Sequence, residues 1–196
     1  MSASRPQYRR RNHIDIEFQG FNIAHDTESS VFDELSKSPE REERYAAAMT
    51  WFGTGPGLES SHIVQGFAWG QIGQGLVVDV GGSHGSVSIA IAQSFPNVGC
   101  IVQDQPKVVA VGRKQLASDS QDRVSFMEHD FFTEQPVRGA DVYLLRWILH
   151  DWSDTYAVRI LQALIPALTP SSKLAICEHV LPEPGMMSAY QERGLR

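Results

Sequence analysis

Residues 76–85, with the sequence LVVDVGGSHG, decide the fold class that this 196-residue chain predicts. Apolar residues interrupted by one acid, Asp79, predict a buried strand, and the glycine-rich turn after it leads into a helix-like segment at residues 86–95. In α/β proteins this order directs backbone N–H groups toward a nucleotide-like ligand. A carboxylate inside such a strand costs free energy unless a partner satisfies it, so Asp79 belongs to the candidate site.

Three glycines in the turn, Gly81, Gly82 and Gly85, leave space where a ligand and the following helix approach the backbone. The turn departs from the Gly-x-Gly-x-x-Gly pattern of dinucleotide-binding proteins, because Val80 stands where the first glycine is expected. An NAD-dependent oxidoreductase is therefore disfavoured. Taken alone, the turn is either a ligand-binding loop of another kind or an ordinary structural turn of an α/β protein.

Composition argues against several classes of function. The formal net charge is −6 and no basic stripe runs through the body of the chain, which argues against nucleic acid as the main partner. No apolar run approaches the roughly 20 residues that a membrane span needs. The arginine cluster within residues 5–11 lacks the apolar core of a secretory signal and predicts a solvated tail. Cys100 and Cys177 fall in predicted strands, as small core residues of a reducing compartment do, so a cytoplasmic location is predicted.

From residue 76 onward, strand-like and helix-like stretches alternate. This alternation predicts an α/β domain in which a parallel sheet is flanked by helices. The connection between the third and fourth strands is short and shows no helical pattern. The predicted strands are residues 76–80, 99–103, 124–128, 141–145 and 173–177, and the predicted helices are residues 86–95, 106–116 and 154–165.

The chain divides into three predicted parts. Residues 1–28 are polar without a regular period and predict a flexible basic segment, a tail or an extended connector. Residues 29–70 predict a helical lead-in, in which Ser38 as N-cap and Pro39 at the first helical position mark the start of a helix. Residues 71–196 form the predicted α/β domain.

Charged residues follow the predicted strands at their carboxyl ends, where ligands of open α/β sheets bind. Asp104, about 20 residues past the glycine turn, is placed to accept hydrogen bonds from two ribose hydroxyls. The alternative for Asp104 is a solvated turn carboxylate. Asp130 can accept from an adenine amine while Phe131 covers the ring, and the alternative for Asp130 is a cap of the following turn.

The fourth and fifth strands lead to Arg146 and Glu178, and His150 lies just beyond Arg146 in the block LLRWILHDWSD. Histidine titrates near neutral pH and can take a proton from a hydroxyl group as its oxygen attacks. Glu178 at the neighbouring strand end can hold the second ring nitrogen. The alternative is a structural histidine. The remaining histidines and the cysteines lack the spacing of metal ligands, so no metal site is predicted.

Together these motifs resemble the plant and fungal small-molecule O-methyltransferases of the caffeate and flavonoid type, most closely their fungal secondary-metabolism branch. The resemblance runs from about residue 30 to residue 184. It rests on VVDVGGSHG, the DQP step at residues 104–106, HDFF at residues 129–132, LLRWILHDWSD and the segment 177–182. It implies a Rossmann-like methyltransferase fold with S-adenosylmethionine as the cofactor and a small-molecule hydroxyl compound as the methyl acceptor.

The resemblance also implies roles for individual residues. The glycine loop, with Asp79, would hold the methionine end of the cofactor, while other residues contact its ribose and adenine. His150 would be the general base and Glu178 would steer it. Ser83 replaces a glycine common in the family, and Arg146 stands where plant members often have lysine. The implied contacts are Asp104 with the ribose, Asp130 and Phe131 with adenine, and Arg146 beside the cofactor.

Two departures from the family pattern concern its ends. The N-terminal helical domain of the family is almost wholly absent, and the chain stops at Arg196, before two further strands and a second acid that flanks the histidine. We therefore expect a C-terminally incomplete sheet with an uncovered edge and apolar face, which favours association, for example as a homodimer. A catalytically inactive fragment or interaction module is the alternative to an enzyme.

Overall fold

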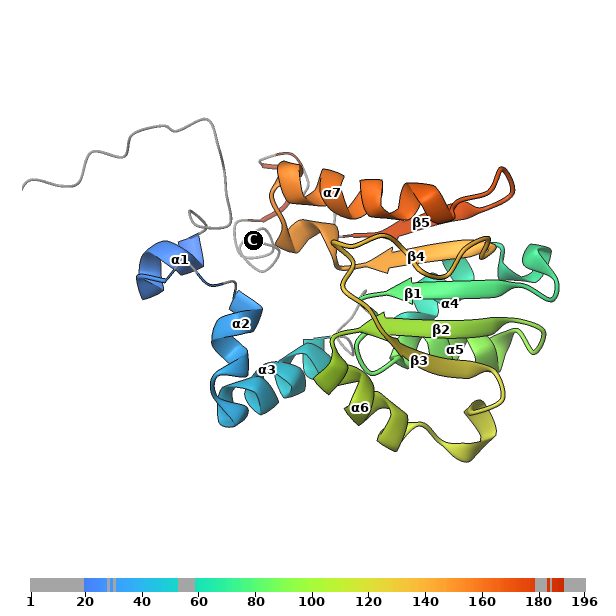
Figure 1. Cartoon of the computed structure of the whole chain (residues 1–196), viewed down its shortest axis with the longest axis horizontal. Helices are drawn as coiled ribbons and strands as arrows, with labels where there is room; N and C mark the ends of the chain where they lie inside the picture. The colour runs from blue at the N-terminus through green and yellow to red at the C-terminus, as the bar shows by residue number, and fades with distance from the viewer. Residues whose placement is uncertain are drawn as a thin grey trace, which may run out of the picture.

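Five parallel strands form one sheet with the order β3-β2-β1-β4-β5 (Figure 1). A computed structural model describes residues 20–27, 29, 31–52, 59–178, 183 and 185–188. The predicted strands agree with the observed bounds to within one residue. These bounds are β1 (Leu76–Val80), β2 (Gly99–Asp104), β3 (Val124–Glu128), β4 (Val142–Arg146) and β5 (Lys173–Cys177).

The order of the strands places the candidate site. From β1 the chain moves outward through β2 to β3, and it then returns to the other side of β1 with β4 and β5. Ligands of such sheets bind beyond the carboxyl ends of the strands where the order reverses, which here is beside β1 and β4. β1 leads into the glycine turn and β4 leads into the block that contains His150.

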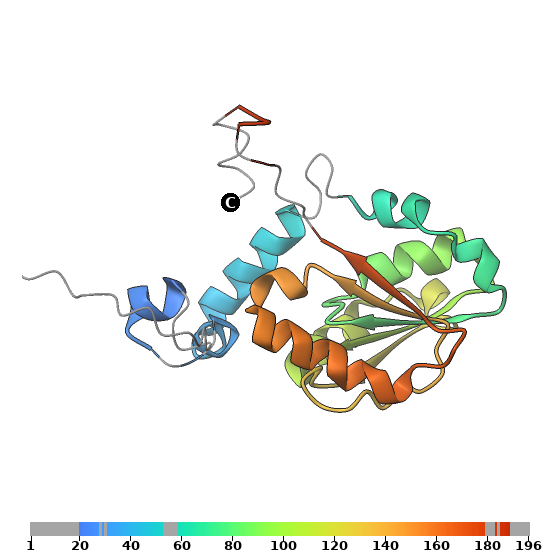
Figure 2. The same ribbon diagram turned by 90° about the horizontal axis from the view of Figure 1, so that it is seen from above.

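Helices cover the two faces of the sheet, as Figure 2 shows from above. The helices α4 (Ser60–Gly66), α5 (Ser86–Ser94) and α6 (Pro106–Gln115) lie on one face, and α7 (Asp154–Leu164) lies on the other. Successive residues of β1 alternate between the two cores, with Val77 in the first and Val78 in the second. Because both faces are buried, the strand needs a nearly continuous apolar run, which explains the pattern of residues 76–80.

The connection between β3 and β4 crosses the sheet without forming a helix. Residues 129–141 contain turns and bends only (Figure 1). Their apolar side chains Phe131, Phe132 and Val137 pack against the same core as α7. The lack of a helical period in this stretch is thus reflected in the structure. The backbone N–H and C=O groups of such a segment need hydrogen-bond partners other than those that a helix provides.

The first helices of the predicted lead-in at residues 29–70 are α2 (Val31–Ser36) and α3 (Pro39–Phe52). Together with the preceding α1 (Gly20–His25), they lie on the side of the carboxyl ends of the strands (Figure 1). α3 begins at Pro39 as predicted, and the carbonyl oxygen of Ser38 accepts from the N–H groups of Arg41 and Glu42. α1 differs from the expectation of a tail or connector through residue 28. The arginine cluster at residues 5–11 lies outside the described residues.

The strand β5 forms one edge of the described sheet, and no other described strand pairs with its outer side. Leu174 and Ile176 on this strand are 39% and 50% exposed. This agrees with the expectation of an uncovered apolar face. None of the helices in the described ranges is both long and apolar enough to cross a membrane.

Candidate active site

The glycine turn is held by the neighbouring strand and fits tightly over the residues beneath it. The N–H groups of Gly81 and Gly82 both donate to the carbonyl oxygen of Gln103, at 2.8 and 3.1 Å. Gly81 has φ +73°, and a Cβ atom there would lie 2.5 Å from Cδ1 of Ile148. A Cβ atom on Gly82 would lie 2.5 Å from Cγ of Asp79. Glycine is therefore favoured at Gly82 by close approach to Asp79, and at Gly81 by its positive φ angle.

Asp79 lies beneath the turn rather than on its surface. Its side chain is 2% exposed, and its Oδ2 atom accepts a hydrogen bond of 2.7 Å from the Ser88 hydroxyl. Burial raises the pKa of Asp79 to about 6, against the opposing effects of the Ser88 hydrogen bond and the positive charge of Arg146. The small exposed surface of Asp79 and its bond to Ser88 are those of a residue that supports the turn from beneath.

Asp104 connects the glycine turn to the start of α6. Its Oδ2 atom accepts from the N–H of Ser83 at 2.8 Å, and its Oδ1 atom accepts from the N–H of Gln105 at 2.7 Å. Burial raises the pKa of Asp104, although both hydrogen bonds oppose the rise. Each carboxylate oxygen has two lone pairs, so each can still accept a hydrogen bond from a ribose hydroxyl. Asp104 thus caps the turn and can still accept hydrogen bonds from ribose hydroxyls.

The segment that follows β3 places Phe131 beside the glycine turn. Its Cε1 atom would lie 3.6 Å from a Cβ on Gly81. Asp130 is exposed, and its Oδ1 atom accepts from the N–H of Phe132 at 3.0 Å. This is the turn cap considered as the alternative for Asp130, and the exposed carboxylate still has lone pairs for a ligand amine.

The guanidinium group of Arg146, at the end of β4, lies over the ring of the next residue, Trp147. Its guanidinium carbon lies 3.6 Å from the centre of the Trp147 ring, a cation–π contact. Trp147 has φ +56°, a conformation that costs free energy for a residue with a large side chain, and its N–H donates to the carbonyl oxygen of Cys177. Burial lowers the pKa of Arg146, while the charges of Cys177 and Asp79 oppose that change.

His150 and Glu178 lie next to each other at the carboxyl ends of β4 and β5. The Nδ1 atom of His150 lies 2.7 Å from Oε2 of Glu178. The Oε1 atom of Glu178 accepts from the N–H groups of Ile148 and Leu149, at 3.0 and 2.8 Å, at the start of the 3₁₀ turn Leu149–Asp151. The His150 side chain is 42% exposed, which is unlike a structural histidine enclosed in the core.

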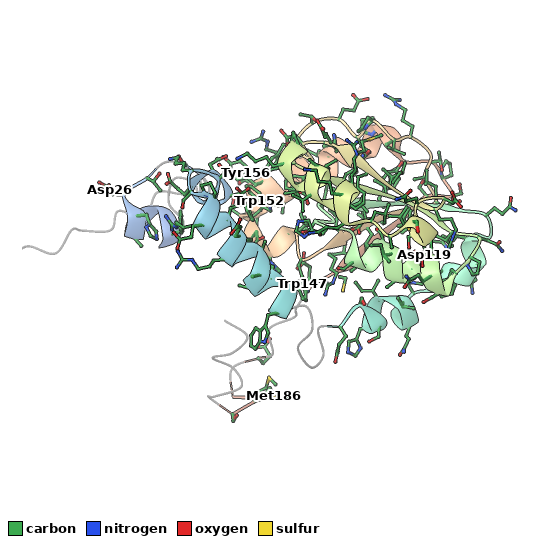
Figure 3. The ribbon with its side chains drawn as sticks, turned by 90° about the horizontal axis from the view of Figure 1, so that it is seen from below. Asp26, Asp119, Trp147, Trp152, Tyr156 and Met186 are labelled. Atoms are coloured by element: carbon green, nitrogen blue, oxygen red, sulfur yellow. The ribbon has the colours of Figure 1, made fainter. Side chains whose placement is uncertain are left out.

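Sequence reasoning did not single out Asp151 or the aromatic cluster around Trp152. Oδ1 of Asp151 lies 3.5 Å from Nε2 of His150. Burial raises the pKa of Asp151; the charge of His150 lowers it and that of Glu178 raises it. Trp152 and Tyr156 lie side by side near the lead-in helices (Figure 3). The Trp152 ring centre also lies 4.7 to 6.4 Å from those of Phe132, Phe131 and Phe32.

The block HDWSD was a signal for Asp151 and Trp152, because both residues stand in it next to His150. Nothing in the sequence indicates that Phe32 of α2 reaches Trp152, since the two residues are far apart along the chain. In the part of the chain that the structure describes, no three His, Cys, Asp or Glu side chains are grouped as a metal site requires.

Comparisons with known proteins show which family this chain is similar to. An O-methyltransferase of the grayanic acid biosynthesis cluster of Cladonia grayi is 48% identical over 180 residues, which cover 91% of this chain and 40% of that protein. The O-methyltransferase aunD of Aspergillus niger is 43% identical, covering 89% of this chain and 42% of that protein. The chain thus spans less than half the length of these relatives.

Solved structures show the same fold. The mitomycin 7-O-methyltransferase MmcR has a TM-score of 0.73 and 29% identity, over 83% of this chain and 46% of that chain. LepI, solved in complex with SAM, has a TM-score of 0.70 and 30% identity, over 92% of this chain and 46% of that chain. The family model of the O-methyltransferase domain matches residues 11–193. The chain therefore belongs to the O-methyltransferase domain family.

Proposed function

We propose that this chain is the cofactor-binding part of an S-adenosylmethionine-dependent O-methyltransferase of fungal secondary metabolism. Its acceptor is a small aromatic compound with a hydroxyl group. The observation that carries the proposal is the pair of His150 and Glu178, 2.7 Å apart at the carboxyl ends of β4 and β5. Its relatives support the acceptor class, since NcsB1, 25% identical, was solved with a hydroxylated naphthoic acid and S-adenosylmethionine.

The residues around the glycine turn fit the cofactor. Gly81 and Gly82 let the turn pack closely on the Ile148 and Asp79 side chains, and Asp104 has acceptor capacity for a ribose. Phe131 offers an apolar surface beside the turn for adenine, Asp130 an exposed carboxylate for its amine, and Arg146 a fixed positive charge. When bound, S-adenosylmethionine supplies a methyl group that its sulfonium already activates, so the reaction needs no metal ion.

The chain's own residues handle the proton. The Glu178 carboxylate beside Nδ1 favours a proton on that nitrogen, which leaves Nε2 of His150 to accept one from the acceptor hydroxyl. Glu178 then stabilises the imidazolium that forms. The N–H groups of Ile148 and Leu149 hold the carboxylate in place during this change of charge. The protein also orients the acceptor oxygen toward the methyl group.

Calorimetric titration of the 196-residue chain with S-adenosylhomocysteine tests cofactor binding directly. Transfer of a labelled methyl group from S-adenosylmethionine to phenolic and naphthoic acceptors tests the reaction. We expect His150→Ala to lower the rate of transfer by about 10²- to 10⁴-fold, the usual contribution of a general base, and to leave cofactor affinity unchanged.

The matched control is His62→Ala. His62 forms a similar contact with a glutamate, Glu59, at 3.0 Å, but on α4 and away from the glycine turn. This variant should transfer methyl groups at the wild-type rate. Equal loss of binding and transfer in His150→Ala would indicate a structural histidine. A wild-type chain that binds the cofactor but methylates no acceptor would instead favour the non-catalytic module.

A further inference from the structure

Two buried amides lie beneath the connection between β3 and β4. Gln103 and Gln135 are each 1% exposed, on the sheet face that α7 covers elsewhere. The Nε2 atom of Gln103 donates to Oε1 of Gln135 at 2.8 Å, and Nε2 of Gln135 donates back to Oε1 of Gln103 at 2.8 Å. The two side chains therefore satisfy each other in a reciprocal pair.

Each glutamine is also tied to a different part of the candidate site. The carbonyl oxygen of Gln103 accepts from the N–H groups of Gly81 and Gly82, and Asp104 is the next residue. The N–H of Gln135 donates to the carbonyl oxygen of Ala163 in α7 at 3.0 Å. The Oε1 atom of Gln135 accepts a second hydrogen bond, 3.0 Å long, from the N–H of Val137.

The choice of amides for this place is informative. Removing two amides from water costs free energy, and an apolar pair of the same shape would be nearly as stable or more stable. A satisfied pair of amides differs from an apolar pair because its hydrogen bonds allow one arrangement only. Residues 129–141 form no helix or strand whose backbone hydrogen bonds would fix their position. The hydrogen bonds of the glutamine pair can fix it instead.

We propose that Gln103 and Gln135 are positioning residues for the nucleoside part of the cofactor. The pair sets the beginning of the segment, with Asp130 and Phe131, at a fixed distance from the glycine turn and Asp104. The two sides of the adenosine pocket come from different strands, and this buried link joins them. The proposal rests on the proposed function, because it assigns adenosine to this pocket.

Three variants separate positioning from stability. Gln135→Leu leaves the Gln103 amide without its partner, and we expect it to be less stable and to bind S-adenosylhomocysteine about tenfold more weakly, a loss of roughly 1.4 kcal/mol. The double variant Gln103→Leu/Gln135→Leu removes both amides and should recover part of the lost stability in urea unfolding, because only the N–H of Val137 then lacks its acceptor. It should not recover affinity, because the directional link is still missing.

Tyr143→Phe is the matched control at the other end of the segment. The buried Tyr143 hydroxyl accepts from the N–H of Ala140 and donates to the carbonyl oxygen of Val137, so its loss should also lower stability. This variant should bind S-adenosylhomocysteine like the wild type. A double leucine variant with wild-type affinity, or a Tyr143→Phe variant with the same weakened binding as Gln135→Leu, would overturn the proposal.

Hydrogen exchange without any ligand gives a second readout. The N–H groups of Phe132 and Thr133 both donate to Asp130, at 3.0 and 2.9 Å. We expect both to exchange faster in the double leucine variant and at the wild-type rate in Tyr143→Phe. Unchanged exchange in the double variant contradicts the proposal. If the wild type binds no S-adenosylhomocysteine, the proposed function fails, whereas the exchange rates still decide whether the pair holds this segment.

Discussion

Asp79 is a buried residue whose titration should affect stability in the acidic pH range. It is 2% exposed, and burial raises its pKa from 3.8 to about 6. The folded state therefore binds more protons than the unfolded state between these two pH values. It follows that the free energy of unfolding falls as the pH rises through this window. Above it, the ionised carboxylate lowers stability by roughly 3 kcal/mol relative to a group that stays neutral.

Asp79→Asn keeps the shape of the side chain and an oxygen to accept from Ser88, but it cannot ionise. We expect the variant to be more stable than the wild type above about pH 7, with the advantage shrinking toward about pH 4. Urea unfolding at several pH values measures this difference. The difference between the two unfolding free energies at each pH cancels the titration of groups that do not interact with Asp79, such as Asp151. A difference that stays constant with pH would contradict the prediction.

At the scale of elements, Glu178 links β5 to the 3₁₀ turn Leu149–Asp151. Its Oε1 atom accepts from two backbone N–H groups that have no helical partner at the start of this turn, those of Ile148 and Leu149. Glu178→Ala should lower the free energy of unfolding by about 1–3 kcal/mol, because both N–H groups lose their acceptor. Glu178→Gln keeps an acceptor oxygen and should lose much less.

The comparison with Glu134→Ala completes this prediction. Glu134 forms an ion pair with Arg138, but both side chains are more than half exposed, so its loss should change stability by less than about 1 kcal/mol. Chemical unfolding of Glu178→Ala, Glu178→Gln and Glu134→Ala measures the loss of unfolding free energy in each and so ranks the three variants. If Glu178→Ala is as stable as Glu134→Ala, Glu178 does not hold the turn.

The elements could be predicted from sequence wherever a local pattern determines them. The central strands β1 and β4 follow from apolar runs buried on both faces, and the start of α3 follows from Ser38 and Pro39. The glycine turn could be recognised in the sequence because the fold favours glycine there. Gly81 has a positive φ angle, and a Cβ on Gly82 would approach Asp79 too closely. α1 was not predicted, since its six residues show no extended period.

Contacts between distant parts of the chain were predicted less well. The contact of His150 with Glu178 was predictable because both follow parallel strands and so meet at one edge. The Ser88 partner of Asp79 could not be predicted, because it depends on the position of α5 under the turn, where the Asp79 side chain also lies against Gly82. The pairing of Gln103 with Gln135 carries no local signal, because neither residue has a period or a motif around it.

At the scale of the whole molecule, we expect the edge strand β5 to govern the self-association of the chain. Leu174 and Ile176 alternate with Ala175 and Cys177, so they share one face of the strand and remain 39% and 50% exposed. Among the described residues no strand pairs with the outer edge of β5. Exposed apolar side chains beside unpaired backbone groups favour association.

We expect the 196-residue chain to self-associate as its concentration rises, with β5 at the interface. Sedimentation velocity over a range of concentrations measures this association. Ile176→Lys should suppress it, because a charged side chain at the edge cannot be buried without a partner. Val111→Lys on α6 is the matched control: Val111 is 40% exposed but lies far from β5 in the sheet order, so this variant should associate like the wild type. A wild type that stays monomeric throughout, or equal suppression by both lysines, would show that β5 is not the interface.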